Sequence, residues 1–230
     1  MSNQTTDNDD SGLSTSMAKM KLENKNQKEI ENKAAIKIQS RWRGHYARKK
    51  NMLITDNMTQ ECIQNHLNIH INLVNDLKNH AIKFNVKIRL PIFPSEISEN
   101  IVKFAIGKKY SIIPTWATDK GDLLINISYN IKRLEVKGFS SDGPSSFGPN
   151  EEWHYIYFID CKNFIDKIFK VYEIKLSNEN KIWKNLKVST TQTYDDQCRE
   201  KRRPRISFNK IQNQLGNHCK LIFDGHISDL

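Results

Sequence analysis

Two short runs in the middle of the chain alternate apolar and polar residues, a pattern that predicts neighbouring β-strands. In the first run, Ile125 and Ile127 are separated by an asparagine, and in the second, Leu134 and Val136 flank Glu135. Side chains along a strand repeat every two residues, so each run places its apolar residues on one face. We expect the two runs to form a β-hairpin or a pair of adjacent strands.

Apolar residues at helical spacing predict helices before these strands. Residues 51–87 carry such a stripe and are expected to form one long helix or a helical hairpin. Pro91 and Pro94 then end the helical pattern, because proline lacks the amide hydrogen and restricts the residue before it. A second helix is expected to start at Ser95 as N-cap and to end at Gly107.

The C-terminal part of the chain is expected to add more strands. Residues 153–160 and 169–176 are rich in aromatic and β-branched residues and read as buried strands. Residues 209–230 contain the pattern of a helix followed by a final strand.

Composition narrows the possible classes of protein. Hydrophobic residues make up 37% of the chain, a low share that indicates an unpacked segment, and residues 1–28 are the expected disordered part. Thirty-six Lys and Arg residues against 26 Asp and Glu residues give a net charge of +10, which favours an anionic partner such as nucleic acid. The four cysteines form no CxxC pair, and no secretory segment or membrane-spanning run is visible. We expect a soluble, intracellular protein with reduced thiols and no membrane partner.

The candidate catalytic residues lie at one end of the first strand, at residue 122, and within the second strand. Glu135 and Lys137 share a face of their strand, and two carboxylates and an ammonium converge if Asp122 ends the first strand near them. Two carboxylates at such a short distance repel each other unless a cation lies between them. Oxygen ligands of this kind suit Mg²⁺. A lysine beside the metal can hold or help to deprotonate an attacking water, which is the chemistry of phosphodiester hydrolysis. The alternative is that Asp122 is only a turn residue and that Glu135 and Lys137 form an ion pair on a solvent-exposed face.

A further carboxylate, Glu99, projects near the apolar stripe of the helix that starts at Ser95. It could assist the site, or it could be an acid favoured by the helix dipole, which is the role expected of Glu96.

Two other segments suit contact with a nucleic acid. The segment from residue 138 to 149 is dense in Gly, Pro and Ser, and its backbone amides and the hydroxyls of Ser145 and Ser146 could lie against a phosphate backbone. Arg202, Arg203 and Arg205 surround Pro204 and are placed for phosphate or guanine contacts. The alternatives are a flexible turn and a solvated basic surface.

Residues 34–50 predict a basic amphipathic helix. Ala35, Ile38, Trp42 and Tyr46 form an apolar stripe, and lysines and arginines without any acid cover the rest. Such helices are typical targets of calmodulin, and the alternative is a basic helix that touches nucleic acid or nothing.

Within this helix, Ile38-Gln39-x-x-x-Arg43-Gly44-x-x-x-Arg48 resembles the complete IQ motif. The resemblance implies binding of calmodulin or a calmodulin-like protein. Ile38 and Gln39 would enter one lobe, Gly44 would permit close approach of the other, and Arg43 and Arg48 would meet acidic groups of the partner.

The strand and loop motifs resemble the PD-(D/E)XK nuclease superfamily over residues 85–230. The matching positions are Glu99, Gly121-Asp122 and Glu135-x-Lys137, with Gly121 where the superfamily has proline. Four further runs are similar to a group of type II restriction endonucleases that cleave GC-N-GC sites: Ser146-Phe147-Gly148-Pro149, Trp153…Tyr157-Phe158-Ile159-Asp160, Thr193-x-x-Asp196-Gln197 and Arg202-Arg203-Pro204-Arg205. The IQ helix is not part of this pattern.

The resemblance implies an α/β fold of the restriction-endonuclease type, with a mixed central sheet flanked by helices, preceded here by an N-terminal helical extension. It further implies a homodimer on double-stranded DNA and Mg²⁺-dependent cleavage. Asp122 and Glu135 would bind the metal, Lys137 would position the water, and Glu99 would assist as an additional or outer ligand. The alternative is a non-catalytic DNA-binding or calmodulin-linked adaptor that retains the fold.

These expectations divide the chain into three parts. Residues 1–28 are a disordered tail, 29–84 a helical region that contains the IQ motif, and 85–230 the nuclease domain. Because an IQ motif requires calmodulin, we expect the protein in the cytoplasm or nucleus of a eukaryotic host, or associated with a virus of such a host.

Overall fold

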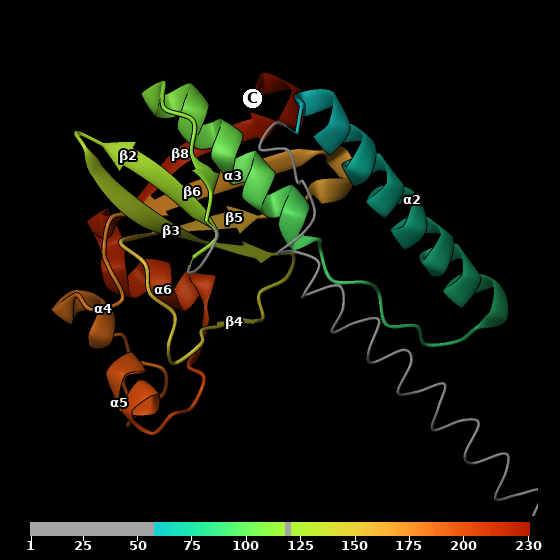
Figure 1. The fold of residues 1–230 in the computed structure, drawn as a ribbon. Coiled ribbons are helices and arrows are strands. Elements are labelled where there is room, and N and C mark those ends of the chain that lie inside the picture. The colour runs from blue at the N-terminus through green and yellow to red at the C-terminus, as the bar shows by residue number, and fades with distance from the viewer. Residues whose placement is uncertain (1–57, 118–120) are drawn as a thin grey trace, which may run out of the picture. The chain divides into compact units, whose positions relative to one another are not determined.

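The computed structural model describes residues 58–117 and 121–230 (Figure 1). The expected disordered tail and the IQ helix at residues 34–50 lie outside the described residues. The described residues belong to one compact unit. Among the described helices, none is long and apolar enough to cross a membrane.

A six-stranded sheet forms the centre of this unit (Figure 1). In sheet order, its strands are β1 (Thr115–Trp116), β2 (Leu123–Ile127), β3 (Asn130–Phe139), β5 (Tyr155–Asp160), β6 (Ile168–Ile174) and β8 (Cys219–His226). Neighbouring strands are antiparallel except for β3 and β5, which are parallel. The strands β2 and β3 form the predicted hairpin, and the sheet is mixed as the family resemblance implied.

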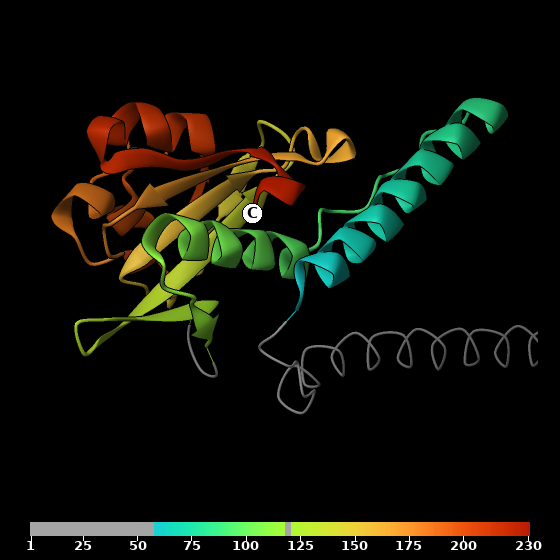
Figure 2. The same cartoon turned by 90° about the horizontal axis from the view of Figure 1, so that it is seen from above.

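Helices lie on both faces of the sheet (Figure 2). They are α2 (Gln60–Phe84), α3 (Ser95–Tyr110), α4 (Lys181–Lys184), α5 (Tyr194–Arg199) and α6 (Phe208–Leu215), with 3₁₀ turns at Phe164–Asp166, Gly216–His218 and Ile227–Asp229. The helix α3 covers one face and α6 the other, so each face has its own apolar core. The predicted α/β class, a central sheet flanked by helices, is therefore confirmed.

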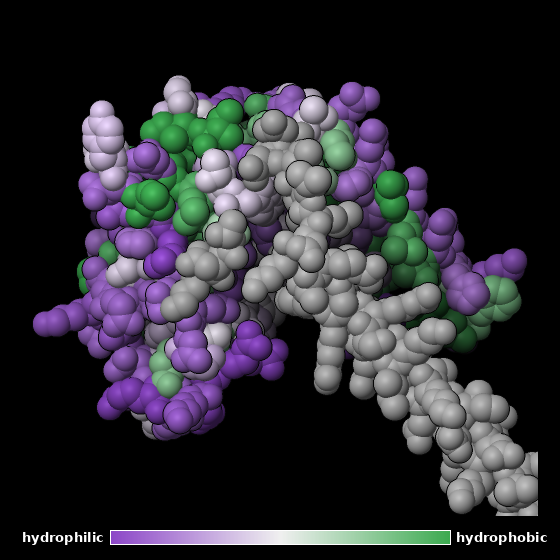
Figure 3. Space-filling model, viewed as in Figure 1, coloured by the Kyte–Doolittle hydropathy of each residue, from purple (hydrophilic) through white to green (hydrophobic). Residues whose placement is uncertain are grey.

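The helix α2 is a single long helix rather than a helical hairpin. It starts after Thr59, whose hydroxyl accepts a hydrogen bond from the amide of Cys62 at 3.2 Å, and it ends at Asn85 in the left-handed conformation. Its first half packs apolar residues into the core. Its second half leaves Ile82 and Phe84 exposed, at 79% and 55%, and Figure 3 shows apolar side chains along this helix.

The helix α3 differs from the sequence prediction at both ends. Its N-cap is Pro94, without a side-chain hydrogen bond, so Ser95 is the first helical residue instead of the cap. The helix also continues past Gly107 through Lys108 and Lys109, whose charges are favourable in a last turn. It ends where Ser111 adopts the left-handed conformation and donates its amide to the Gly107 carbonyl at 2.8 Å. The predicted buried stripe is confirmed and comprises Ile97, Ile101, Val102, Ala105 and Ile106.

A second, two-stranded sheet lies apart from the first. It pairs β4 (Pro144–Ser146) with β7 (Arg205–Ser207) in antiparallel fashion. The Gly-, Pro- and Ser-rich segment expected as a loop therefore contains a short strand, which begins at a proline as edge strands can.

Candidate active site

The β2–β3 hairpin brings Asp122 to Glu135. Leu123 pairs with Leu134, so Asp122 lies beside the start of the Glu135 segment. The Asp122 amide donates to the Leu134 carbonyl at 2.9 Å, and the Asp122 carboxylate accepts from the Val136 amide at 2.8 Å. The two bonds are made to the residues on either side of Glu135, and they hold the Asp122 carboxylate beside β3.

Gly121 allows the chain to enter the hairpin at this point. Its φ of +77° lies in the region that favours glycine, and a Cβ here would lie 3.0 Å from the Leu134 carbonyl oxygen. That oxygen accepts the hydrogen bond from Asp122. A glycine at position 121 therefore has a local physical reason.

Lys137 lies between two carboxylates. Its Nζ is 2.5 Å from Glu135 Oε1 on the same strand and 3.4 Å from Glu151 Oε2 on the connection between β4 and β5. The strand alternation predicted the first pair. Glu151 was missed, because it follows a Gly-Pro-Asn turn and no periodicity relates it to Lys137.

The buried position of these groups changes their proton affinities. Burial and the nearby charges of Asp122 and Glu151, against the opposing effect of Lys137, together raise the pKa of Glu135 to about 7. Burial lowers the pKa of Lys137, but Glu135, Glu151 and Asp122 outweigh burial and leave it raised overall. Lys137 is thus an ammonium, whereas Glu135 exchanges a proton near neutral pH.

The donor set fits a divalent cation. Asp122, Glu135 and Lys137 carry a net negative charge when all are ionised, and a cation bound to the two carboxylates would relieve the repulsion that, after burial, raises the Glu135 pKa. Within the residues that the structure describes, no group of three or more His, Cys, Asp or Glu side chains could hold a metal ion, so a cation here would rely on two carboxylates. Mg²⁺ is commonly held by one or two carboxylates together with waters and substrate phosphate, which matches Asp122 and Glu135.

Glu99 is on α3, close to where that helix crosses β3. Its neighbour Ser98 packs on Gly138, where an added Cβ would lie 3.2 Å from the serine Cβ, and Gly138 directly follows Lys137. Glu99 itself is 5% exposed, so it is not a solvated acid at the helix start. Because side chains alternate along β3, the face that packs on α3 is the one opposite to Glu135 and Lys137. The packing of α3 therefore buries Glu99 beside β3 without joining it to the Glu135–Lys137 pair.

The β4–β7 sheet joins the two segments singled out for DNA contact. Ser146 pairs with Arg205 and Ser145 with Ile206, and the Phe147 amide donates to the Pro204 carbonyl at 3.0 Å. Ile206 is buried, so its face points inward and the Ser146–Arg205 face points outward.

The three arginines have different surroundings. Arg202 forms an ion pair with Glu200 at 2.9 Å. Arg203 and Arg205 are exposed on either side of buried Pro204 and form no ion pair within the described part of the chain. They are the two arginines available for an anionic ligand.

Phe147 connects this sheet to the Glu135–Lys137 centre. It is fully buried, with Trp183 and Tyr194 at ring-centroid distances of 5.8 Å, and Lys137 Nζ lies 5.8 Å from its ring. The Ser-Phe-Gly-Pro run is thus a structural link between β4 and the candidate active site.

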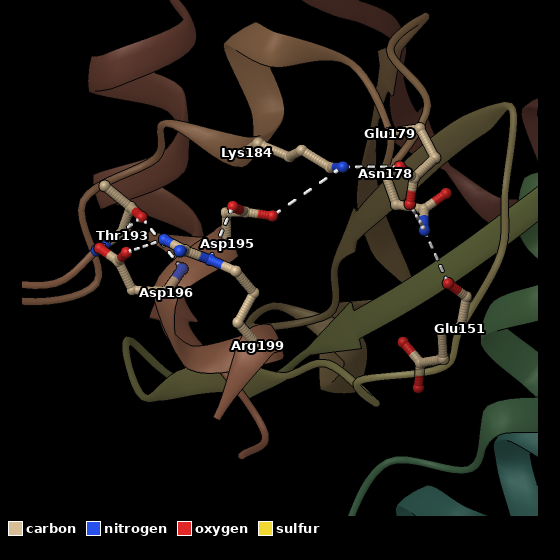
Figure 4. Close-up of polar contacts among 8 residues, drawn as sticks. All are labelled: Glu151, Asn178, Glu179, Lys184, Thr193, Asp195, Asp196 and Arg199. Atoms are coloured by element: carbon tan, nitrogen blue, oxygen red, sulfur yellow. Dashed lines mark hydrogen bonds and ion pairs between the residues drawn. The ribbon is translucent and has the colours of Figure 1, made fainter. Parts of the chain in front are cut away.

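The Thr-x-x-Asp-Gln run has a structural explanation as well. Thr193 caps α5, and the Asp196 carboxylate accepts hydrogen bonds from the Thr193 amide and hydroxyl at 2.8 and 2.7 Å (Figure 4). Arg199 pairs with Asp195 and Asp196. These contacts fix the helix that leads into the arginine segment.

Two family models match the chain. One, described as Bsp6I restriction endonuclease, matches residues 54–214, and the other, the IQ calmodulin-binding motif, matches residues 32–50. No curated protein and no solved structure gives a match. The first match covers more than half of the chain and includes Asp122, Glu135, Lys137 and the three arginines.

Proposed function

The chain belongs to the Bsp6I restriction endonuclease family, and from this premise we propose that it is a Mg²⁺-dependent endonuclease that hydrolyses phosphodiester bonds of duplex DNA. The observation that carries the proposal is the convergence of Asp122, Glu135 and Lys137 on one hairpin. A family that cuts DNA needs an anionic metal site and a cationic group beside it, and this hairpin offers both.

Each side chain has a separate role in the proposed reaction. Asp122 and Glu135 hold Mg²⁺, which supplies positive charge to the scissile phosphate when it is bound. Lys137 donates a hydrogen bond that orients the attacking water, because its raised pKa keeps it protonated. Glu99, buried on the α3 side of β3, would act only as an outer support of this strand.

The outward face of the β4–β7 sheet is the proposed DNA contact. Arg203 and Arg205 supply charge and forked donors for phosphate or guanine, and Ser146 adds a hydroxyl beside Arg205. Ser145, expected from the sequence to contact DNA as well, pairs with buried Ile206 on the inward face and is left out of the proposed contact. Arg202 contributes through the same segment, although its pairing with Glu200 reduces its share. A homodimer would present two such faces to a symmetric duplex site.

The IQ motif supports binding of calmodulin. We infer that Ile38, Gln39, Arg43, Gly44 and Arg48 make that contact and that it couples the nuclease to a calmodulin-like partner.

A plasmid digest tests the nuclease activity directly. The wild-type chain should cut supercoiled DNA with Mg²⁺ and fail to cut it with EDTA, and Glu135→Ala and Lys137→Ala should each abolish cutting while the circular dichroism spectrum stays that of the wild type. If either variant cuts at the wild-type rate, the assignment of the active site is wrong. DNA binding without any cutting by the wild type would favour the non-catalytic adaptor.

A further inference from the structure

The ammonium of Lys137 has two carboxylate partners from different parts of the chain. Glu135 lies two residues before it on β3, and Glu151 lies on the connection that leads from β4 to β5. The first contact follows from strand geometry alone, since residues i and i+2 share a face. The second contact depends on tertiary structure and therefore requires a separate explanation.

Three features hold Glu151 in place. Gly148 leaves room for its carboxylate, because a Cβ at that position would lie 2.9 Å from Glu151 Oε1. The Asn178 side chain donates to the Glu151 carbonyl at 2.8 Å (Figure 4). It also accepts from the Trp153 amide at 3.3 Å, and the two bonds fix the backbone. Phe147, buried at the other end of the segment, anchors its start.

The carboxylate oxygen that faces Lys137 has few other contacts. Glu151 Oε2 is buried and accepts no hydrogen bond within the described residues, and its ion pair with Lys137 is what offsets the cost of burying it. The segment of residues 147–151 is thus fixed at three points, and it places the Glu151 carboxylate against Lys137 of the proposed active site.

A lysine with Glu135 as its single carboxylate partner would compete with a cation for that carboxylate. The 2.5 Å contact shows how closely the ammonium approaches Glu135. An ammonium and a divalent cation repel each other, so a cation on Glu135 would displace an unsupported lysine. A second carboxylate on the far side gives the ammonium a partner that the cation does not take.

We propose that Glu151 is a positioning residue for Lys137: it holds the ammonium between β3 and the β4–β5 connection so that Glu135 can bind the metal without losing the lysine from the site. The inference rests on the proposed nuclease function. Glu151 acts through Lys137 and contacts neither the DNA nor the water in this scheme.

The test uses the full chain and four variants. Glu151→Gln removes the charge and keeps the shape, Glu151→Asp keeps the charge and shortens the side chain, and Gly148→Ala displaces the carboxylate without altering any charged group. Glu152→Gln is the matched control, because Glu152 is an adjacent carboxylate that pairs on the surface with Arg133 at 3.8 Å.

Single-turnover cleavage and DNA affinity are measured separately. Glu151→Gln should lower the rate of cleavage by about 100-fold, the loss typical of a catalytic group misplaced by about 1 Å, and leave the affinity for DNA in EDTA unchanged. Glu151→Asp should recover part of the rate, Gly148→Ala should lose rate, and Glu152→Gln should match the wild type. A Glu151→Gln enzyme that cuts at the wild-type rate would overturn the proposal, as would a loss of affinity equal to its loss of rate.

A second readout does not depend on catalysis. In metal-free protein with ¹³C-labelled lysine, the two ε-protons of an immobilised Lys137 should be inequivalent in the wild type and in Glu152→Gln, and should merge in Glu151→Gln. The Lys137→Arg variant assigns the signal. If the wild type fails to cut DNA, the proposed function is wrong, yet this spectrum still decides whether Glu151 holds Lys137: signals that stay inequivalent in Glu151→Gln refute the positioning role.

Discussion

Ser146 and Arg205 are partners across the β4–β7 sheet, on the face that points away from the core. Residues directly opposite in an antiparallel pair have neighbouring Cβ atoms, so the hydroxyl and the guanidinium are presented together. Arg203, two residues before Arg205 and also exposed, extends the basic edge of this face.

DNA binding should depend on the exposed arginines more than on the paired one. Arg203→Ala is expected to weaken binding and to flatten the salt dependence of the affinity by about one unit if it meets one phosphate. Arg202→Ala should have a smaller effect, because Arg202 already pairs with Glu200 at 2.9 Å. Fluorescence anisotropy over a range of salt concentrations measures the DNA affinity and its salt dependence for both variants, each made in the Glu135→Ala protein so that the DNA is not cut. An unchanged affinity and slope in Arg203→Ala would show that the arginine segment is only solvated surface.

The stability of the metal-free protein should fall as the pH rises toward neutrality. The pKa of Glu135 is raised from 4.5 to about 7 on folding, chiefly by burial, so the folded state binds the proton more tightly than the unfolded state. This contribution is fully present below pH 4.5 and is lost as the pH rises through 7. Urea unfolding of the wild type and of Glu135→Gln should show the steeper decline in the wild type, and parallel curves would contradict the shift.

Gly121→Ala should destabilise the fold through two effects. A residue with φ of +77° costs about 1–2 kcal/mol when it carries a Cβ, and the new Cβ would also lie 3.0 Å from the Leu134 carbonyl oxygen. Gly216→Ala is the matched control, since its φ is +50° and an added Cβ would meet nothing within 4 Å. Chemical denaturation should therefore show a larger loss for Gly121→Ala, and equal losses would mean that the close approach is relieved by a small shift.

A peptide covering residues 34–50 should bind calmodulin. The apolar anchor is predicted to be essential, so replacing Ile38 and Gln39 together by alanine should remove binding while the charge stays the same. Calorimetry with and without Ca²⁺ decides between an anchored and a purely electrostatic contact, because in the second case the double variant binds as well as the parent. Absence of binding under both conditions would leave a chance basic helix.

Local pattern predicted the elements that depend on local geometry. Alternation around Glu135 located the hairpin, and the stripe from Ile97 to Ile106 located the buried face of α3. The Glu135–Lys137 pair follows from the same alternation, which is why the sequence placed both on one face. The division of the chain at residue 85 stays a prediction.

Features that depend on long-range pairing could not be read in the same way. The short strand β4 has three residues and starts with a proline, so its pairing with β7 leaves almost no periodic signal. Glu151 reaches Lys137 only because the chain returns past β3 before it enters β5. The Thr193–Asp196 run contributed to the family resemblance, and its hydrogen bonds show that it caps α5.

The parallel pairing of β3 with β5 obliges the chain to travel back along the sheet, and here the return path has no helix. That one path carries Ser146, which faces outward beside Arg205, and Glu151, which faces Lys137. On the proposed function, exchanging this segment between relatives to alter DNA contact would therefore also displace Glu151 from Lys137. Engineers who want a new cutting site from this scaffold would have to vary Arg203 and Arg205 and keep Phe147 through Glu151 intact.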